Sequence, residues 1–358
     1  MKQTSFESIK VLVCIGSGGV GKTTVAASLA VQAAKEGLRV LVLTIDPAKR
    51  LAQTLGIEGT DDVTRVPKQD FSGELFASVI DHKKTFDEFV LRAAKKSESA
   101  ERLLQNRLYQ QLSTSLSGSQ DFTALEKLYS CVESGEYDLV ILDTPPTKHA
   151  MDFLNAPQKL AALFNEGVAK WFREPAEKGF FSGMLQMGTK QVLKALETLT
   201  GSGFIQELSD FFSSIEKWQK ELNQRTTDVH RMLVSPSTQF CLVTSFDQTK
   251  LNEASYFAKE IRKGGYHLNR VVINRTFPFW LNLEGVEAGS SDGKLHGLFL
   301  EMKQYYQKRQ KQYSDFASTL QKDVDLYRVP DMVEDISDLE GLEKISALLK
   351  LGDTDVAR

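Results

Sequence analysis

Residues 10–24 read KVLVCIGSGGVGKTT, and this stretch decides the fold. Val11 to Ile15 form a short apolar run rich in β-branched residues, which is typical of a buried strand in a parallel sheet. The run leads into a glycine-rich loop that matches G-x-x-x-x-G-K-T from Gly16 to Thr23. The apolar spacing that follows predicts a helix from Lys22 that stops at Gly37.

The spacing of this loop suits a polyphosphate. Backbone N–H groups can wrap around phosphate oxygens only where side chains are absent, and the helix N-terminus adds a partial positive charge. Lys22 is expected to reach the β- and γ-phosphates, and the Thr23 hydroxyl to coordinate Mg²⁺. The alternative, a glycine-rich turn without a ligand, is disfavoured by the strand before it and the helix after it. The predicted ATP-binding residues of the loop are Gly16, Ser17, Gly18, Gly19, Val20, Gly21, Lys22, Thr23 and Thr24.

Two further apolar runs end in a carboxylate. Residues 39–45 lead into Asp46, and residues 138–142 lead into Asp143. Open α/β sheets bind ligands beyond the carboxyl ends of their strands, so both side chains are candidates for the same site. Asp143 is expected to hold Mg²⁺ through a water. Asp46 either caps the short helix expected at 48–55 or positions the attacking water, and the neighbouring phosphate loop favours the second role.

The segment after the second carboxylate reads DTPPTKHAMDFL, residues 143–154. Two consecutive prolines make a stiff loop. We predict that Asp143, Thr144, Pro145, Pro146 and Thr147 sense the γ-phosphate and move the helix that follows.

Composition and charge fit a cytoplasmic enzyme. The chain has 358 residues, a net charge of −3 and a pI of about 6.1, so no excess of positive charge indicates nucleic acid. Its three cysteines are far apart in the sequence and form no CxxC pair, which predicts thiols in a reducing compartment. We expect no signal peptide, because the N-terminal residues MKQTSFESIK do not have the pattern of one. We expect no membrane-spanning segment, because no run of 18 apolar residues occurs.

Strand and helix patterns alternate along the chain and predict one mainly parallel α/β domain of about seven strands. The expected core comprises residues 1–82, 118–150 and 234–340, with helical insertions at about 83–117 and 151–233. Within this scheme we predict a helix opening at Asp121, a loop at 277–295, a charged helix at 299–320, a strand at 324–329 and one short helix in the tail. The second insertion is rich in Phe, Met and Gly, which fits either a packed helical subdomain or a groove for apolar partners.

Four stretches together resemble the ArsA-type ATPases, the family of arsenite pumps and of targeting factors for tail-anchored proteins. They are GSGGVGKTT (16–24), TIDPAKRL (44–51), LYQQLSTSLSGSQDFTALEKLY (108–129) and LVILDTPPTKHAMDFLNAP (139–157). The resemblance covers nearly the whole chain. The stretch at 108–129 resembles a bacterial branch of the family. The resemblance implies a P-loop ATPase that uses ATP and Mg²⁺ and dimerises with its nucleotide sites facing each other.

The same resemblance assigns roles to residues. It implies Asp46 and Lys22 as catalytic residues, residues 143–147 as switch II, Asn274 as a reader of the adenine edge and Pro330 as part of the loop that packs on the base. It also implies that residues 151–233 hold a hydrophobic helical client protein.

The chain departs from the family at Ser17, where most members carry a lysine that reaches the partner's phosphates. Three outcomes are open. The sites work without this contact, another cation such as Lys49, Arg50 or Lys148 replaces it, or the partner is a related ATPase that supplies the lysine. The dimer is therefore a homodimer or a heterodimer.

Two other functions remain open. One is a positioning protein of the partition-ATPase type, although the tail is neither basic nor amphipathic. The other is the soluble ATPase subunit of an anion pump, although three separated cysteines do not suit a soft metalloid ion.

Overall fold

The computed structural model of the chain divides into two compact units. The phosphate-loop unit comprises Met1–Ile80, Leu128–Met151 and Met232–Arg358, and the helical unit comprises Asp81–Lys127 and Asp152–Arg231. The structure describes residues 6, 8–45, 50–57, 62–67, 70–94, 98–106, 109–110, 117–145, 150–159, 219–221, 223–278, 293–332 and 335–355.

One eight-stranded sheet forms the centre of the phosphate-loop unit, in the order β3-β4-β2-β5-β1-β6-β7-β8. All neighbouring strands pair in parallel except β3 and β4, which are antiparallel. This confirms the predicted P-loop α/β fold. The strands are β1 Val11–Ile15, β2 Arg39–Thr44, β3 Thr64–Arg65, β4 Glu74–Val79, β5 Leu139–Asp143, β6 Thr238–Ser245, β7 Leu268–Thr276 and β8 Asp325–Pro330.

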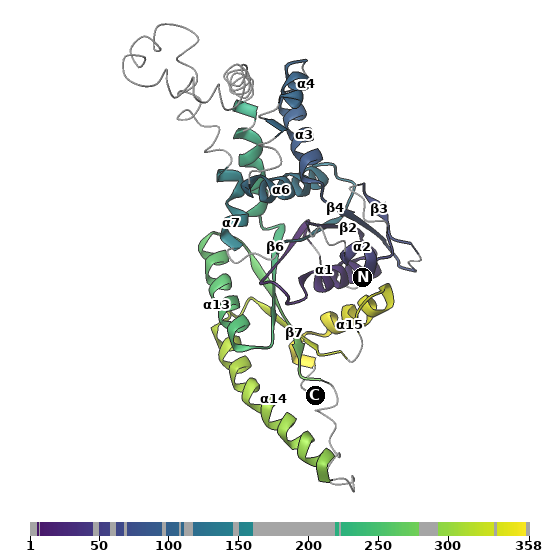
Figure 1. The fold of residues 1–358 in the computed structure, drawn as a ribbon, viewed down its shortest axis with the longest axis vertical. Coiled ribbons are helices and arrows are strands. Elements are labelled where there is room, and N and C mark those ends of the chain that lie inside the picture. The colour runs from purple at the N-terminus through teal and green to yellow at the C-terminus, as the bar shows by residue number, and fades with distance from the viewer. Residues whose placement is uncertain are drawn as a thin grey trace, which may run out of the picture. The chain divides into compact units, whose positions relative to one another are not determined.

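Helices connect the strands, as a parallel sheet requires. In the phosphate-loop unit α15 packs against α1 and β8, while α13 packs against α14, β6 and β7 (Figure 1). The helices are α1 Lys22–Lys35, α2 Arg50–Thr54, α3 His82–Ala93, α4 Glu98–Gln105, α6 Ser117–Glu133, α7 Ala150–Leu154, α13 Gln248–Lys263, α14 Gly293–Thr319 and α15 Leu339–Asp355. Within the described ranges, every helix is too short or too polar to cross a lipid bilayer.

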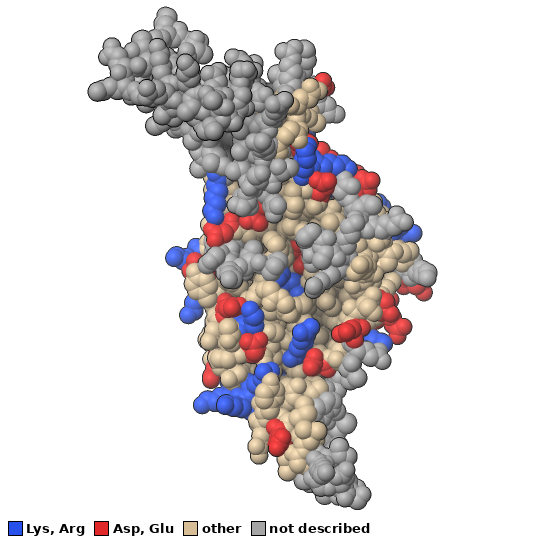
Figure 2. Space-filling view, in the orientation of Figure 1, with Lys and Arg blue, Asp and Glu red and all other residues tan. Residues whose placement is uncertain are grey.

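Charged side chains of both signs are interspersed on the face of the molecule shown in Figure 2. Helix α14 carries both signs as well, although basic residues such as Lys303, Lys308 and Lys311 outnumber Glu301 and Asp315. No continuous basic track is visible among the described residues on this face.

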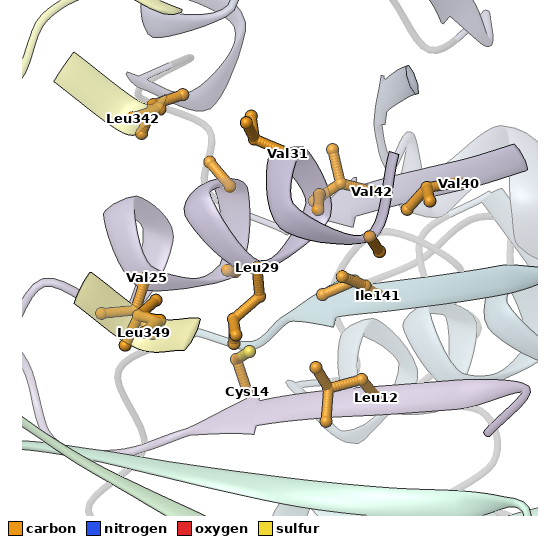
Figure 3. Close-up of a cluster of buried hydrophobic side chains, with 14 of the residues drawn as sticks. Leu12, Cys14, Val25, Leu29, Val31, Val40, Val42, Ile141, Leu342 and Leu349 are labelled. Atoms are coloured by element: carbon orange, nitrogen blue, oxygen red, sulfur yellow. The ribbon is translucent and has the colours of Figure 1, made fainter. Parts of the chain in front are cut away.

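The core of the phosphate-loop unit lies on both faces of the sheet. Leu12 and Cys14 of β1 pack toward Val25 and Leu29 of α1, and α15 adds Leu349 beside them (Figure 3). The alternate residues of β1, which point to the opposite face, are also almost fully buried. A strand covered on both faces must be apolar throughout, which explains the unbroken run at 11–15.

Several boundaries differ from those expected. Asp121 lies inside α6, which begins at Ser117. The helix expected at Phe299 begins at Gly293. Its first turn therefore lies in the segment that was predicted as a loop. Pro330 ends β8 instead of opening a loop. The tail contains a helix of 17 residues that packs on α1, so the prediction of a short helix there was wrong.

An aromatic cluster holds the helical unit together. Phe89 and Phe122 meet edge to face at 4.8 Å between ring centroids, and Tyr109 stacks on Phe86 at 5.9 Å. The Tyr109 hydroxyl donates a hydrogen bond of 2.6 Å to Asp87. Burial is the main cause that raises the pKa of Tyr109 above its usual range, so the hydroxyl keeps its proton and acts as a donor.

The helical unit also contains a buried charge. The Glu126 side chain is 0% exposed, and Arg225 Nη2 lies 2.9 Å from its Oε1 atom. Arg92 Nη1 approaches the same oxygen at 3.9 Å. Residues 160–218, where most of the predicted apolar groove falls, lie outside the described residues.

Candidate functional site

The phosphate loop connects β1 to α1 and is clamped at both ends. A Cβ atom on Gly16 would lie 2.1 Å from the carbonyl oxygen of Val243 on β6. Gly21 has a φ of +87°, and a Cβ atom there would lie 2.3 Å from Asn274 Nδ2. Only glycine fits these two positions, because each combines an unusual φ with close contact to a neighbouring strand.

Lys22 folds back across the loop. Its Nζ atom donates a hydrogen bond of 2.9 Å to the carbonyl oxygen of Ser17, and the residue is 7% exposed. The ammonium group is therefore held within the curve of the loop, where a phosphate would need a counter-charge.

Asp143 gathers hydroxyl groups from two other elements. Thr23 Oγ1 at the start of α1 donates to Asp143 Oδ2 at 2.7 Å, and Thr44 Oγ1 at the end of β2 donates to the same oxygen at 3.1 Å. Asp143 is 2% exposed. Sequence reasoning expected Thr23 and Asp143 at one site. It missed Thr44, although a hydroxyl group at the end of a predicted strand was an available signal.

Switch II begins against β1. The hydroxyl of Thr144 donates to the carbonyl oxygen of Cys14 at 2.8 Å. Pro145 follows it at the cavity. Pro146, Thr147 and Lys148 lie outside the described residues, as do Asp46 and Lys49, and Arg50 is described by its backbone alone.

A cavity of about 690 Å³ opens over the phosphate loop. Sequence reasoning missed Arg275, Ile336 and Ser337, which reach it from distant parts of the chain and carry no local signal. The described residues that line it are Gly18, Gly19, Gly21, Lys22, Thr23, Thr24, Ala27, Leu51, Gln53, Thr54, Asp143, Thr144, Pro145, Arg275, Ile336 and Ser337.

Asn274 links β7 to the phosphate loop. Its Nδ2 atom donates to the carbonyl oxygen of Val20 at 3.0 Å, and its Oδ1 atom accepts from the backbone N–H of Arg275 at 3.0 Å. Pro330 lies beside this position, since it pairs with Thr276 across β7 and β8. The assignment of Asn274 and Pro330 to the adenine base stays a prediction.

Ser17 points into its own chain. Its hydroxyl donates a short hydrogen bond to Glu253 Oε2 on α13, and Lys250 Nζ donates to the same oxygen at 2.9 Å. These two hydrogen bonds, that from Ser17 first, lower the pKa of Glu253 below its ordinary value. The Lys250 ammonium and the Ser17 hydroxyl therefore share one carboxylate oxygen beside the phosphate loop.

Two of the cysteines are neighbours in space. Cys14 and Cys241 are paired in register on β1 and β6, both are buried, and both are free thiols. The hydrogen bond with Cys241 and burial raise the pKa of Cys14. Cys131 is half-buried, and no group of three or more His, Cys, Asp or Glu side chains suited to a metal ion occurs within the described ranges.

Comparison with known proteins agrees with this geometry. The family model described as "Anion-transporting ATPase" matches residues 9–351. The chain belongs to this family. It is 26% identical over 336 residues to the ATPase get3 of Aspergillus terreus, which covers 93% of this chain and 88% of that relative. The protein is accordingly an ATPase, and a nucleotide is its substrate.

Proposed function

We propose that this protein is an ATP-hydrolysing conformational switch whose nucleotide binds in the cavity over the phosphate loop. The observation that carries the proposal is the convergence of Lys22, Thr23 and Asp143 on one cavity. Lys22 would neutralise the β- and γ-phosphates, and the glycines of the loop would present backbone N–H groups to them. Asp46, by resemblance, would position the attacking water.

The residues present fit a magnesium ion. Thr23 and Asp143 bring a hydroxyl and a carboxylate oxygen within 2.7 Å of each other at the edge of the cavity, and Mg²⁺ prefers oxygen ligands. We propose that these two residues hold the ion, Thr23 directly and Asp143 through a water. When bound, Mg²⁺ neutralises charge on the phosphate oxygens.

Two substitutions test the nucleotide site. Lys22→Ala should abolish ATP binding, because the triphosphate loses its main counter-charge. Asp46→Asn should retain binding and lose turnover by a factor of about 10² or more. ATP affinity and phosphate release should be measured for both variants. Lys35→Gln, on an exposed turn of α1, and Asp62→Asn are matched controls. Normal turnover in Asp46→Asn would mean that Asp46 is a helix cap.

We further propose that the protein acts in the cytoplasm and that ATP favours a dimer, either a homodimer or a heterodimer with a related ATPase. Each subunit would be one domain with two helical insertions. The family resemblance supports this. Light scattering of Asp46→Asn with ATP and with ADP should give a dimer mass in ATP and a lower mean mass in ADP. Equal masses in both would contradict the proposal.

The second insertion, residues 151–233, would hold a hydrophobic helical client. Charged substitutions at Met184 and Met187 should abolish binding of an apolar helical peptide while the melting temperature changes by a few degrees. In a packed core the same substitutions would bury unpaired charge and unfold the protein.

A further inference from the structure

A β-bulge in β7 sets Arg275 apart from the rest of its strand. Asn274 pairs with Val329 of β8 and Thr276 pairs with Pro330, so Arg275 is the extra residue between two regular pairs. Its φ is +55°. This left-handed conformation is sterically unfavourable for a residue with a long side chain, and Asn or Gly would adopt it more easily.

Such strain is often retained at binding sites, where a bulge turns a side chain out of the strand alternation. The bulge brings Arg275 to the cavity over the phosphate loop, and the residue is exposed. Among the described residues that line this cavity, Lys22 and Arg275 are the two that carry a positive charge.

Hydrogen bonds fix the bulge relative to the loop. Asn274 accepts from the backbone N–H of Arg275 through Oδ1 and donates to Val20 through Nδ2, both at 3.0 Å. On the other side of the bulge, Thr276 Oγ1 donates to the carbonyl oxygen of Val329 at 3.1 Å. The backbone that carries the guanidinium group is therefore tied to the same loop that would hold the phosphates.

We propose that Arg275 is a second nucleotide-binding cation, whose guanidinium group contacts phosphate oxygens that ADP and ATP share. The inference rests on the proposed position of the nucleotide in this cavity. A planar guanidinium offers two parallel N–H donors to a phosphate, which a lysine cannot do. Asp143 and Thr23 line the same cavity from β5 and α1, whereas Arg275 reaches it from β7, where it follows Asn274, the residue that donates to Val20 of the loop.

The test compares Arg275→Asn with Arg275→Lys. Asparagine tolerates a positive φ, so Arg275→Asn should keep or raise the melting temperature. It should weaken binding of ADP and of inorganic tripolyphosphate by a similar factor of about 10- to 100-fold, the scale of a lost charge-assisted hydrogen bond. Arg275→Lys should lie between it and the wild type. Lys308→Gln removes one exposed positive charge from α14 and should leave both affinities unchanged.

The other results overturn the inference in distinct ways. Unchanged tripolyphosphate affinity in a folded Arg275→Asn protein would exclude a phosphate contact, and a loss seen with ADP alone would move the contact to the base or ribose. If Arg275→Asn fails to fold, wild-type affinity in Arg275→Lys would exclude the bidentate contact. If Lys22→Ala also binds both ligands normally, the proposed nucleotide position itself is wrong.

Discussion

The two units of the chain are stabilised by different means. In the phosphate-loop unit a mainly aliphatic cluster packs on the sheet, and Leu12, Leu29 and Ile141 illustrate a core built largely from apolar area. In the helical unit, aromatic rings surround Tyr109, and a fully buried carboxylate, Glu126, is compensated by Arg225. An apolar core tolerates small losses gradually, whereas a buried ion pair becomes costly as soon as one partner is missing.

The largest effect is expected from the ion pair. Glu126→Ala should destabilise the helical unit by about 3–5 kcal/mol, because Arg225 is left without its carboxylate partner. Hydrogen exchange should increase in α3 while β1 and β5 keep their protection. Replacing both residues with methionine should recover much of the stability, because it removes both charges of the pair. A double variant as unstable as Glu126→Ala would show that packing, not charge, is the cause.

A cavity in the aliphatic core should have the next largest effect. Leu29→Ala is expected to cost about 3 kcal/mol, from lost burial and from the void beneath α1. Chemical denaturation measures it, and hydrogen exchange should now increase in β1 and α1. Ala26→Gly removes a single buried methyl group from the same helix and adds the backbone cost of glycine, so it serves as a smaller comparison of about 1 kcal/mol. A loss below that of Ala26→Gly would mean that α15 closes over the void.

Removal of one hydroxyl should have a smaller effect in the helical unit. Tyr109→Phe deletes the donor to Asp87, which keeps its ion pair with Lys83 at 2.7 Å. The expected loss of stability is about 1 kcal/mol, measured by thermal or chemical unfolding. No loss would indicate that the aromatic cluster alone determines the stability around α3.

The smallest effect concerns the surface pair beside the loop, and it depends on pH. The pKa of Glu253 is lowered in the folded state from its ordinary value of 4.5. The carboxylate therefore stabilises the fold at pH values above 4.5, and this stabilisation is lost as the pH falls from 4.5 through the lowered pKa. Glu253→Gln should therefore cost well under about 1 kcal/mol at pH 7 and less at pH 3. Melting curves at both pH values test this. A constant difference would assign the effect to the Ser17 hydrogen bond and not to charge.

Sequence reasoning reached the parts of the molecule that are encoded locally. Residues 11–15 and 39–44 were recognisable as buried strands because both faces of a parallel sheet need apolar side chains. Thr23 and Asp143 were expected at one site because parallel strands end at the same edge of a sheet. Strand β3 escaped prediction, since two residues show no periodicity.

Other features depend on pairs that are distant in the sequence. Ser17 meets Glu253 across 236 positions, and Glu126 meets Arg225 across 99. No local pattern marks either pair. The bulge at Arg275 is similar, because its register shift arises from pairing with β8, more than 50 residues further on.

The close packing at both ends of the phosphate loop determines when the loop loses its conformational entropy. Fixing a backbone residue costs roughly 1–2 kcal/mol of conformational entropy. Gly16 lies close to Val243 of β6, and Gly21 lies close to Asn274 of β7, whose side chain also donates a hydrogen bond to Val20 of the loop. The loop is therefore ordered when the sheet folds and not when a nucleotide arrives. Affinity should then be insensitive to substitutions elsewhere that only lower stability, until the sheet itself begins to open.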